Sequence, residues 1–344
     1  MAPKSSPTPR RGASGDRMQL RMLLYGFEAT QVIRTLARLG LADRLRQRPA
    51  RAEALARALG VDARLLFRLM RYAAAIGVLT QDRRDRFGLT RLGTFLRSDI
   101  PGSIRPLALL CGEEYYRAAG ALLDCVRTGT PAFQIANGAP FFDYLSRHAE
   151  TSRTFNASML VRVLDYAQLA AQFDFSAFPV IIDVGGGRGG LIAAILRRHR
   201  SVQGVLFDQP HVLPEARRYL GDQGVLHRCR TVGGSAFASI PAGGDAYIES
   251  VFLHDLDDRR ATRVLRNIRK AIPDKGSLLL VEHVVPPGDQ PSLAKSMDIR
   301  MMELGGLERT HGEWGALLRR SGFQLRGAVD LGIPPKLLIA RPTQ

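Results

Sequence analysis

The second half of the chain alternates between short apolar runs and longer segments with helical spacing. Runs rich in aliphatic and β-branched residues are typical of buried strands, and amphipathic segments between them are typical of helices. This pattern predicts strands at residues 180–184, 204–207, 246–252, 276–281 and 336–340. Strands that alternate with helices form a doubly wound sheet, which binds ligands at the carboxyl ends of its strands. We therefore predict an α/β fold with a Rossmann-like domain over residues 171–344.

The first half of the chain has a different pattern, in which helical segments surround one small hairpin. Residues 52–59 and 62–77 have helical spacing, and residues 78–89 have the pattern of two short strands. Helices joined by a turn and followed by a hairpin form a winged helix. We predict an all-helical and winged-helix domain over residues 18–103, followed by a helical linker and substrate-pocket region over residues 104–170.

The winged helix serves either as a dimerisation domain in an enzyme or as the DNA-binding domain of a regulator. The helix predicted at residues 62–77 is mostly apolar and offers few side chains that could read base edges, which favours the enzyme. Residues 18–45 carry apolar side chains on more than one helical face, so we expect this segment to pack in a homodimer. Residues 1–17, rich in Pro, Ser, Gly and Arg, are predicted to be a disordered tail.

The composition is that of a globular protein, with 45% hydrophobic residues over 344 positions. No apolar run reaches membrane-spanning length and no secretory signal is apparent, so we expect a cytoplasmic protein. The three cysteines are scattered without metal-ligand spacing and are expected to be reduced thiols. The net charge of +17 raises the question of a nucleic-acid partner, but the arginines are spread along the whole chain. Dispersed, solvated arginine is therefore favoured over a dedicated polyanion site.

The stretch VIIDVGGGRGGL, residues 180–191, predicts a strand that turns tightly into a helix around a nucleotide-like ligand. Its glycines also satisfy the GxGxxG spacing of a dinucleotide-binding turn, at Gly185, Gly187 and Gly190. Asp183 decides against a dinucleotide, because its carboxylate would repel a pyrophosphate but would accept hydrogen bonds from an ammonium group. S-adenosylmethionine (SAM) has that ammonium group and no phosphate. Asp208, at the end of the next strand, is placed to accept hydrogen bonds from a ribose.

The candidate chemistry lies just beyond two further strands. His254 and Asp255 follow the strand at 246–252, Glu282 follows the next strand, and Glu308 lies in a loop that could close the crevice. A histidine flanked by carboxylates is held in one tautomer and made more basic, so it can remove a proton from a hydroxyl such as a phenol. No metal is expected, because His283 and Glu282 are adjacent in a strand and point to opposite faces.

Taken together, these segments resemble the SAM-dependent O-methyltransferases of the plant caffeate and bacterial polyketide type. The resemblance extends from about residue 18 to residue 342 and includes, in order, LTRLGTFLRSDIPGS, VRTGTPAF, FDYL, FNASM, DVGGGRGG, FDQPHV, HDLDD and GGLERT. It implies a winged-helix domain that forms an intertwined dimer and a Rossmann-like SAM-binding domain. It also implies a small aromatic hydroxyl substrate from secondary metabolism, a general base and its flanking acids, and cofactor contacts. The residues concerned are His254 with Glu282 and Glu308, and Gly185, Gly187 and Asp208.

The sequence departs from that family pattern at several positions. Residues 234–237, Gly-Ser-Ala-Phe, replace the usual GDFF or GDMF, so Ser235 and Phe237 are predicted cofactor contacts on weaker grounds. In the pattern DAYLLKRVLHDW, the lysine is replaced by Ser250 and the tryptophan by Leu256. Methylation at carbon or nitrogen, or a SAM-bound relative without methyl transfer, remains open. The residues predicted to line the substrate pocket are Phe133, Met159, Asp255 and Met301.

Overall fold

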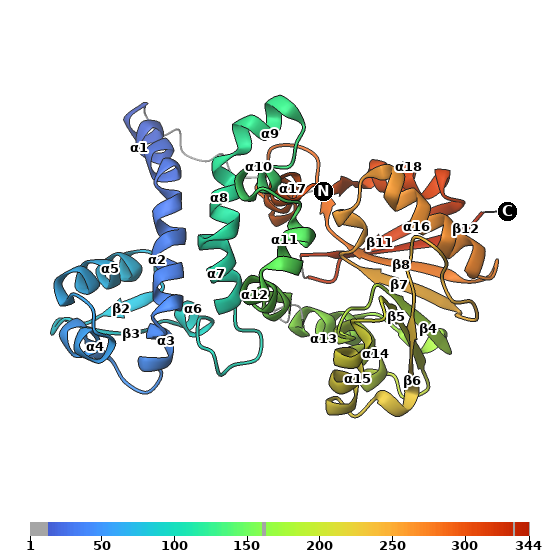
Figure 1. Cartoon of the computed structure of the whole chain (residues 1–344), viewed down its shortest axis with the longest axis horizontal. Coiled ribbons are helices and arrows are strands. Elements are labelled where there is room, and N and C mark those ends of the chain that lie inside the picture. The colour runs from blue at the N-terminus through green and yellow to red at the C-terminus, as the bar shows by residue number, and fades with distance from the viewer. Residues whose placement is uncertain (1–12, 160–162, 333, 344) are drawn as a thin grey trace, which may run out of the picture. The chain divides into compact units, whose positions relative to one another are not determined.

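The computed structural model describes residues 13–159, 163–332 and 334–343. The chain divides into two compact units, residues 1–113 and residues 114–344, and each is described here by itself. The first unit holds the winged helix, and the second holds the large sheet with a set of helices that precedes it (Figure 1).

The first unit is a helical winged-helix domain, as predicted. Asp62 begins one of its central helices by accepting a hydrogen bond from the Leu65 amide at 2.8 Å, and Gly60 ends the preceding helix in the left-handed conformation. A three-stranded antiparallel sheet in the order β1-β3-β2 forms the wing, and its Phe87 is buried in the core of this unit. The elements of this unit are α1 Ala13–Leu24, α2 Gly26–Arg38, α3 Leu41–Arg44, β1 Ala50–Arg51, α4 Ala52–Leu59, α5 Ala63–Ala75, β2 Leu79–Gln81, β3 Arg86–Leu89, α6 Arg91–Thr94 and α7 Arg105–Gly112.

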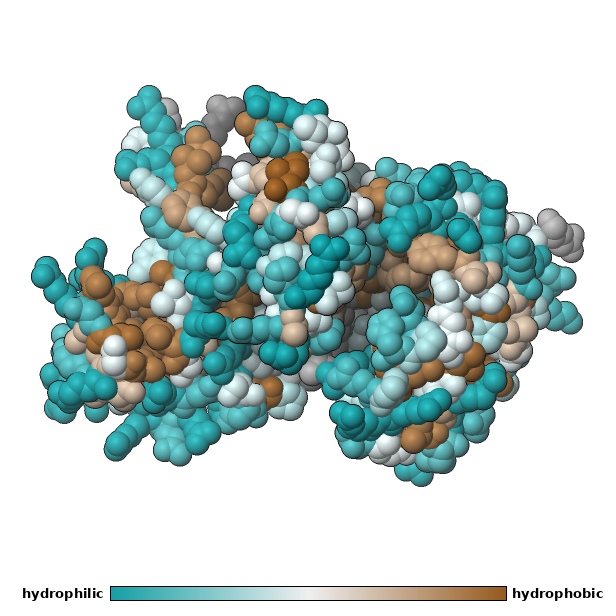
Figure 2. All heavy atoms as spheres, in the orientation of Figure 1, coloured by the Kyte–Doolittle hydropathy of each residue, from teal (hydrophilic) through white to brown (hydrophobic). Residues whose placement is uncertain are grey.

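Helix α1 begins at Ala13, within the segment predicted from composition to be a disordered tail. Asp16 in its first turn is well placed for a helix start, because an acidic side chain interacts favourably with the amino end of the helix dipole. The remainder of the predicted tail, residues 1–12, lies outside the described residues. Apolar side chains along α1 and the start of α2 are exposed, among them Leu20, Leu23 and Phe27 (Figure 2).

The second unit begins with short helices that carry an aromatic cluster. Phe133 is fully buried and packs edge to face on Phe141 and Tyr144, with ring centroids 5.0 and 5.4 Å apart. The Gly/Pro-interrupted segment at residues 128–145 thus forms a packed aromatic core. The helices of this region are α8 Glu114–Gly120, α9 Leu122–Thr128, α10 Ala132–Asn137, α11 Phe141–Arg147, α12 Ala149–Met159 and α13 Val163–Gln172.

A seven-stranded sheet in the order β11-β12-β8-β7-β4-β5-β6 organises the rest of this unit. Strands β8, β7, β4, β5 and β6 run parallel to one another. At one edge, β12 runs antiparallel to β8, and β11 runs antiparallel to β12. The strand order reverses between β4 and β7, which is where a doubly wound sheet opens its ligand crevice. The strands are β4 Val180–Val184, β5 Gln203–Asp208, β6 Cys229–Gly233, β7 Ala246–Ser250, β8 Ser277–Glu282, β11 Phe323–Val329 and β12 Lys336–Pro342.

Helices cover both faces of this sheet (Figure 1). Helices α13, α14 and α15 pack on one face, and α16 and α18 pack on the other around Trp314. The remaining elements are the helices α14 Gly190–Arg198, α15 Leu213–Asp222, α16 Asp258–Ala271, α17 Leu293–Leu304 and α18 His311–Arg320, the short 3-10 helices η2 Phe175–Ala177, η3 Leu226–Arg228 and η4 Leu253–Asp255, and the strands β9 Val284–Val285 and β10 Arg309–Thr310. Among the described helices, none combines the length and apolar character needed to cross a membrane.

Candidate active site

The turn between β4 and α14, residues 185–189, is called here the glycine turn. Gly185, Gly187 and Gly189 have φ angles of +71°, +55° and +86°, in the region that favours glycine. A Cβ atom on Gly189 would lie 2.9 Å from the Leu206 side chain, whereas a Cβ atom on Gly187 would meet no described atom within 4 Å. The main chain at Gly187 is therefore open, and a ligand can approach it directly, which fits the backbone contacts expected of a SAM site.

Asp208, the last residue of β5, closes one side of the glycine turn. Its Oδ2 accepts a hydrogen bond from the Gly187 amide at 2.7 Å, and its Oδ1 accepts one from the Gln209 amide at 2.6 Å. The side chain is half-buried, so part of it still faces solvent. Asp208 thus lies where a carboxylate can both brace the turn and accept hydrogen bonds from a hydroxylated ligand.

Asp183 lies beneath the glycine turn. Its side chain is only 1% exposed, and its Oδ2 is 2.7 Å from the position that a Cβ on Gly186 would occupy. Burial, together with the neighbouring carboxylate of Asp208, raises the pKa of Asp183 to about 7. A direct contact between Asp183 and the ammonium group of the cofactor remains a prediction.

Ser235 and Phe237 follow β6, the strand that pairs with β5. Ser235 is exposed, and Phe237 is half-buried with the Arg260 guanidinium 5.2 Å from its ring centroid. The Gly234 amide donates to the Asp208 carbonyl at 3.0 Å, so this loop starts at the same edge of the sheet as the glycine turn. The contacts of Ser235 and Phe237 with the cofactor stay predictions.

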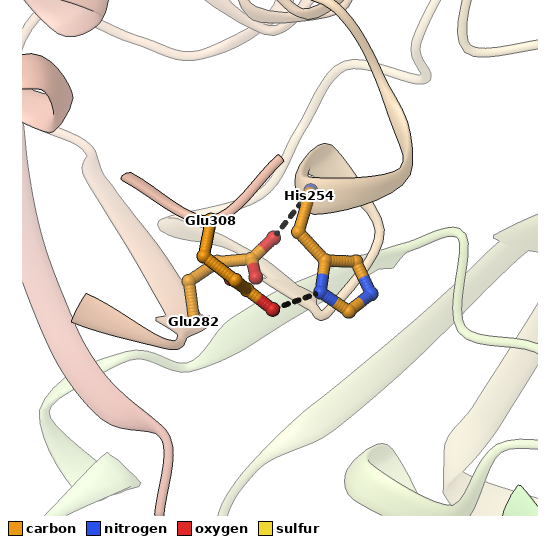
Figure 3. A group of neighbouring side chains, drawn as sticks. All are labelled: His254, Glu282 and Glu308. Atoms are coloured by element: carbon orange, nitrogen blue, oxygen red, sulfur yellow. Dashed lines mark hydrogen bonds and ion pairs between the residues drawn. The ribbon is translucent and has the colours of Figure 1, made fainter. Parts of the chain in front are cut away.

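His254 lies in η4, beyond the carboxyl end of β7, and is 3% exposed. Its Nδ1 is hydrogen-bonded to Glu308 Oε1 at 2.9 Å (Figure 3), and its Nε2 lies 3.6 Å from Asp255 Oδ1. When Nδ1 carries the proton that it donates to Glu308, Nε2 holds the lone pair and can accept a proton. In that tautomer an imidazole is able to act as a general base, and this role of His254 stays a prediction.

Glu282, at the end of β8, is fully buried and contacts the backbone of the same segment. Its Oε1 accepts hydrogen bonds from the amides of Leu253 at 3.0 Å and His254 at 3.3 Å (Figure 3). Burial raises the pKa of Glu282 well above its usual range, and the carboxylates of Glu249 and Glu308 add to this. The sequence predicted Glu282 as a flanking acid, and the structure adds that Glu282 accepts hydrogen bonds from the main chain of residues 253 and 254.

Three side chains that the sequence prediction missed hold either this segment or the loop that carries Glu308. Arg309, fully buried, donates to the carbonyls of Leu253 at 3.1 Å and Leu256 at 2.8 Å. Asp298 on α17 accepts a hydrogen bond from the Glu308 amide at 2.9 Å, and Glu249 on β7 accepts one from the Phe252 amide at 3.2 Å. Arg309 follows Glu308 directly in the motif GGLERT, so its neighbourhood was a usable signal. Glu249 stands where the family pattern has leucine, but this departure alone does not reveal what the side chain contacts.

The predicted pocket residues fall in different surroundings. Asp255 lies beside His254, and Met301 is buried on α17, the helix that also carries Asp298. Phe133 is fully buried in the aromatic cluster, and Met159 is 36% exposed at the end of α12. Ser250, in place of the family lysine, lies 3.2 Å from the Tyr166 hydroxyl. All four pocket assignments stay predictions.

Family models match the two halves of the chain. An O-methyltransferase dimerisation domain matches residues 22–99, and an O-methyltransferase domain matches residues 120–324. The fold matches that of the crystal structure of LaPhzM, at 41% identity and a TM-score of 0.88, covering 95% of this chain and 99% of that one. It also matches CalO1, a methyltransferase in calicheamicin biosynthesis solved with S-adenosylhomocysteine, at 28% identity and a TM-score of 0.87, covering 97% and 100% of the two chains.

Curated relatives cover nearly the whole chain. The phenazine O-methyltransferase PhzM of Lysobacter antibioticus is 42% identical, over 94% of this chain and 95% of the relative. The phenazine-1-carboxylate N-methyltransferase of Pseudomonas aeruginosa is 32% identical, over 93% of this chain and 96% of the relative. The similar proteins thus include both oxygen and nitrogen methyltransferases.

Proposed function

Because the chain belongs to the family of SAM-dependent O-methyltransferases of secondary metabolism, we propose that it methylates a hydroxyl group of a small planar aromatic compound. His254 serves as the general base. The observation that carries this proposal is the 2.9 Å hydrogen bond between His254 Nδ1 and Glu308, which leaves Nε2 to accept the hydroxyl proton.

SAM, when bound, would supply an electrophilic methyl group, and its sulfur would keep the electron pair of the broken carbon–sulfur bond and leave as S-adenosylhomocysteine. The glycine turn and Asp208 would hold one side of this cofactor, and His254 Nε2 takes the proton of the acceptor hydroxyl. Glu308 then stabilises the imidazolium that results, in the way that a buried carboxylate stabilises a charged histidine in other enzymes. Holding the acceptor oxygen in line with the methyl group contributes about 7 kcal/mol or more when alignment is good.

We infer a hydroxylated phenazine or a similar fused aromatic as the acceptor. The relative at 42% identity is named as a phenazine O-methyltransferase, and it covers nearly the full length of this chain. Phe133, Met159, Asp255 and Met301 are proposed to line the site for this ring system. The exposed apolar residues of α1 and α2 and the matched dimerisation domain support a homodimer as the working form.

Methylation at a ring nitrogen is the second candidate, because one relative is named as a phenazine-1-carboxylate N-methyltransferase. An aromatic ring nitrogen already carries a lone pair and needs no base, whereas a hydroxyl must lose its proton. The buried His254–Glu308 pair therefore favours oxygen as the acceptor.

The proposal is tested by incubating the purified protein with methyl-labelled SAM and a matched panel of hydroxyphenazines, hydroxynaphthoates and the corresponding unsubstituted phenazines. We expect one methyl group to be added to the hydroxylated compounds, located on oxygen by fragmentation in the mass spectrometer. Labelling of phenazines that lack a hydroxyl would instead establish nitrogen as the acceptor. Turnover should be unchanged by EDTA, because we propose no role for a metal ion.

A further inference from the structure

The turn that leads from β7 to His254 contains a backbone conformation that its residue type disfavours. Val251 has a φ angle of +48°, in the left-handed region, although it is β-branched. A non-glycine residue in this backbone conformation costs of order 1–3 kcal/mol of folding free energy, and it persists only where its surroundings hold it in place. The segment that immediately precedes His254 is therefore strained, and something must hold it.

Two buried carboxyl groups accept hydrogen bonds from the residues that follow Val251. The Phe252 amide donates to Glu249 Oε2. The amides of Leu253 and His254 both donate to Glu282 Oε1. Both glutamates are 0% exposed. They come from neighbouring parallel strands and occupy the face of the sheet that α16 and α18 cover.

The two carboxyls come from neighbouring strands, and each affects the pKa of the other. Burial raises the pKa of Glu249 to about 8, and it also raises that of Glu282. At neutral pH at least one of the two is therefore protonated, so the pair does not carry two negative charges. The other charged or titratable groups around the pair are Asp183 from β4, His254 and Asp255 from η4, and Glu308 from the loop before β10.

The sheet itself does not require an acid at this position. The family pattern has leucine where this chain has Glu249, and a buried carboxyl is costly unless it is paired. Glu249 accepts a hydrogen bond from the Phe252 amide, two residues before His254, so it can influence the imidazole through the backbone.

Resting on the proposed role of His254, we propose that Glu249 is a positioning residue that, together with Glu282, holds the strained 251–254 segment with the imidazole against Glu308. A proton on at least one of the two carboxyls lets these neighbouring acids occupy the same buried region without repelling each other. The pair then presents an acceptor to each of the three amides in turn.

Two substitutions separate this role from simple space filling. In Glu249→Gln, the side-chain oxygen can still accept from the Phe252 amide, so we expect kcat within about threefold of the parent. In Glu249→Leu, that acceptor is lost, and we expect kcat to fall about ten- to a hundredfold with little change in the KM for SAM, as expected when a reacting group is misplaced by about 1 Å. Ser277→Ala, a buried change at the opposite end of β8, is the control and should leave both constants unchanged.

The pH profile gives a readout that a purely structural role would not move. Above about pH 8 the Glu249 carboxyl in the parent protein becomes charged in its buried surroundings, so activity should decline there. Glu249→Gln should lack that decline, because its amide does not titrate. Persistence of the same alkaline decline in Glu249→Gln would contradict the part assigned to the Glu249 carboxyl.

Nuclear magnetic resonance of the full-length protein tests the position of the imidazole without relying on turnover. The chain has seven histidines, and the His254 ring signals are assigned by their loss in His254→Gln. We expect these signals to shift or broaden in Glu249→Leu and to remain in place in Glu249→Gln. Unchanged signals together with undiminished kcat in Glu249→Leu would overturn the proposal. Full turnover in His254→Ala would instead refute the base, and the ring signals would still report on Glu249.

Discussion

Asp183, Glu249, Glu282 and Glu308 are four of the buried carboxyl groups of the second unit, and each is 4% exposed or less. The sequence led to three of them, because Asp183 ends a strand before glycines and the two others follow from position and resemblance. Glu249 escaped prediction because an acid inside a strand pattern does not reveal its neighbours. The contact of Glu282 with the main chain of residues 253–254 was equally out of reach, because it depends on how the turn after β7 folds.

The pKa of Asp183 makes a prediction about stability at this scale. The folded protein holds the Asp183 proton more tightly than the unfolded chain, since burial raises the pKa from 3.8 to about 7. The free energy of unfolding should therefore contain a contribution that falls as pH rises from about 4 to about 7. Asp183→Asn removes this contribution, so its melting temperature relative to the parent should rise through that interval and level off above it. A difference independent of pH would contradict the assignment.

At the scale of elements, the strands with strong apolar runs were predicted well. The prediction of residues 180–184 matches β4, and four other predicted strands overlap β5, β7, β8 and β12. The strands β6 and β11 were missed. Strand β6 is short with polar residues, and β11 lies at the sheet edge with alternating exposure and an irregular register near Gly327. Strands β6 and β11 form by pairing with β5 and β12, and the local sequence pattern does not reveal such pairing.

Two substitutions in the glycine turn should affect different properties, one the binding of the cofactor and the other the stability of the fold. A Cβ on Gly187 meets open space, so Gly187→Ala should strain only its left-handed backbone, by about 1–2 kcal/mol, and should leave the protein folded. The added methyl group projects toward the proposed cofactor site, so we expect the Kd for SAM in calorimetry to rise about tenfold or more. Gly189→Ala, the matched change, places its Cβ against Leu206 and should lower the melting temperature more. Equal SAM affinity in Gly187→Ala and the parent would contradict this placement of the site.

At the scale of the whole molecule, the sequence predicted both a winged-helix domain and a doubly wound domain, and the fold confirms them. The positive charge did not identify a partner, and the matched dimerisation and O-methyltransferase domains support an enzyme rather than a DNA-binding regulator. The acceptor could not be read from the sequence, because pocket shape depends on side chains from helices that are far apart in the chain.

The proposed homodimer can be tested through α1. Leu20 and Leu23 are 60% and 70% exposed, and burying each leucine contributes about 1.5–3 kcal/mol. We expect the Leu20→Glu/Leu23→Glu variant to weaken dimerisation about a hundredfold or more, measured by light scattering over a dilution series. Leu226→Glu, which changes an exposed leucine in η3, should leave the dimer intact. A monomeric parent protein, or a double variant that dimerises like the parent, would contradict the proposal.

The most direct test of the central claim is the single-turnover rate of His254→Ala with two acceptors of the same shape at pH 8. One is a hydroxyphenazine whose hydroxyl is largely protonated, and the other is a nitro-substituted analogue that is already ionised. Loss of a general base should lower the rate with the first acceptor by about a hundredfold or more. The rate with the second should fall less than about tenfold, because no proton has to be removed. Equal losses with both acceptors, or no loss with either, would contradict the account.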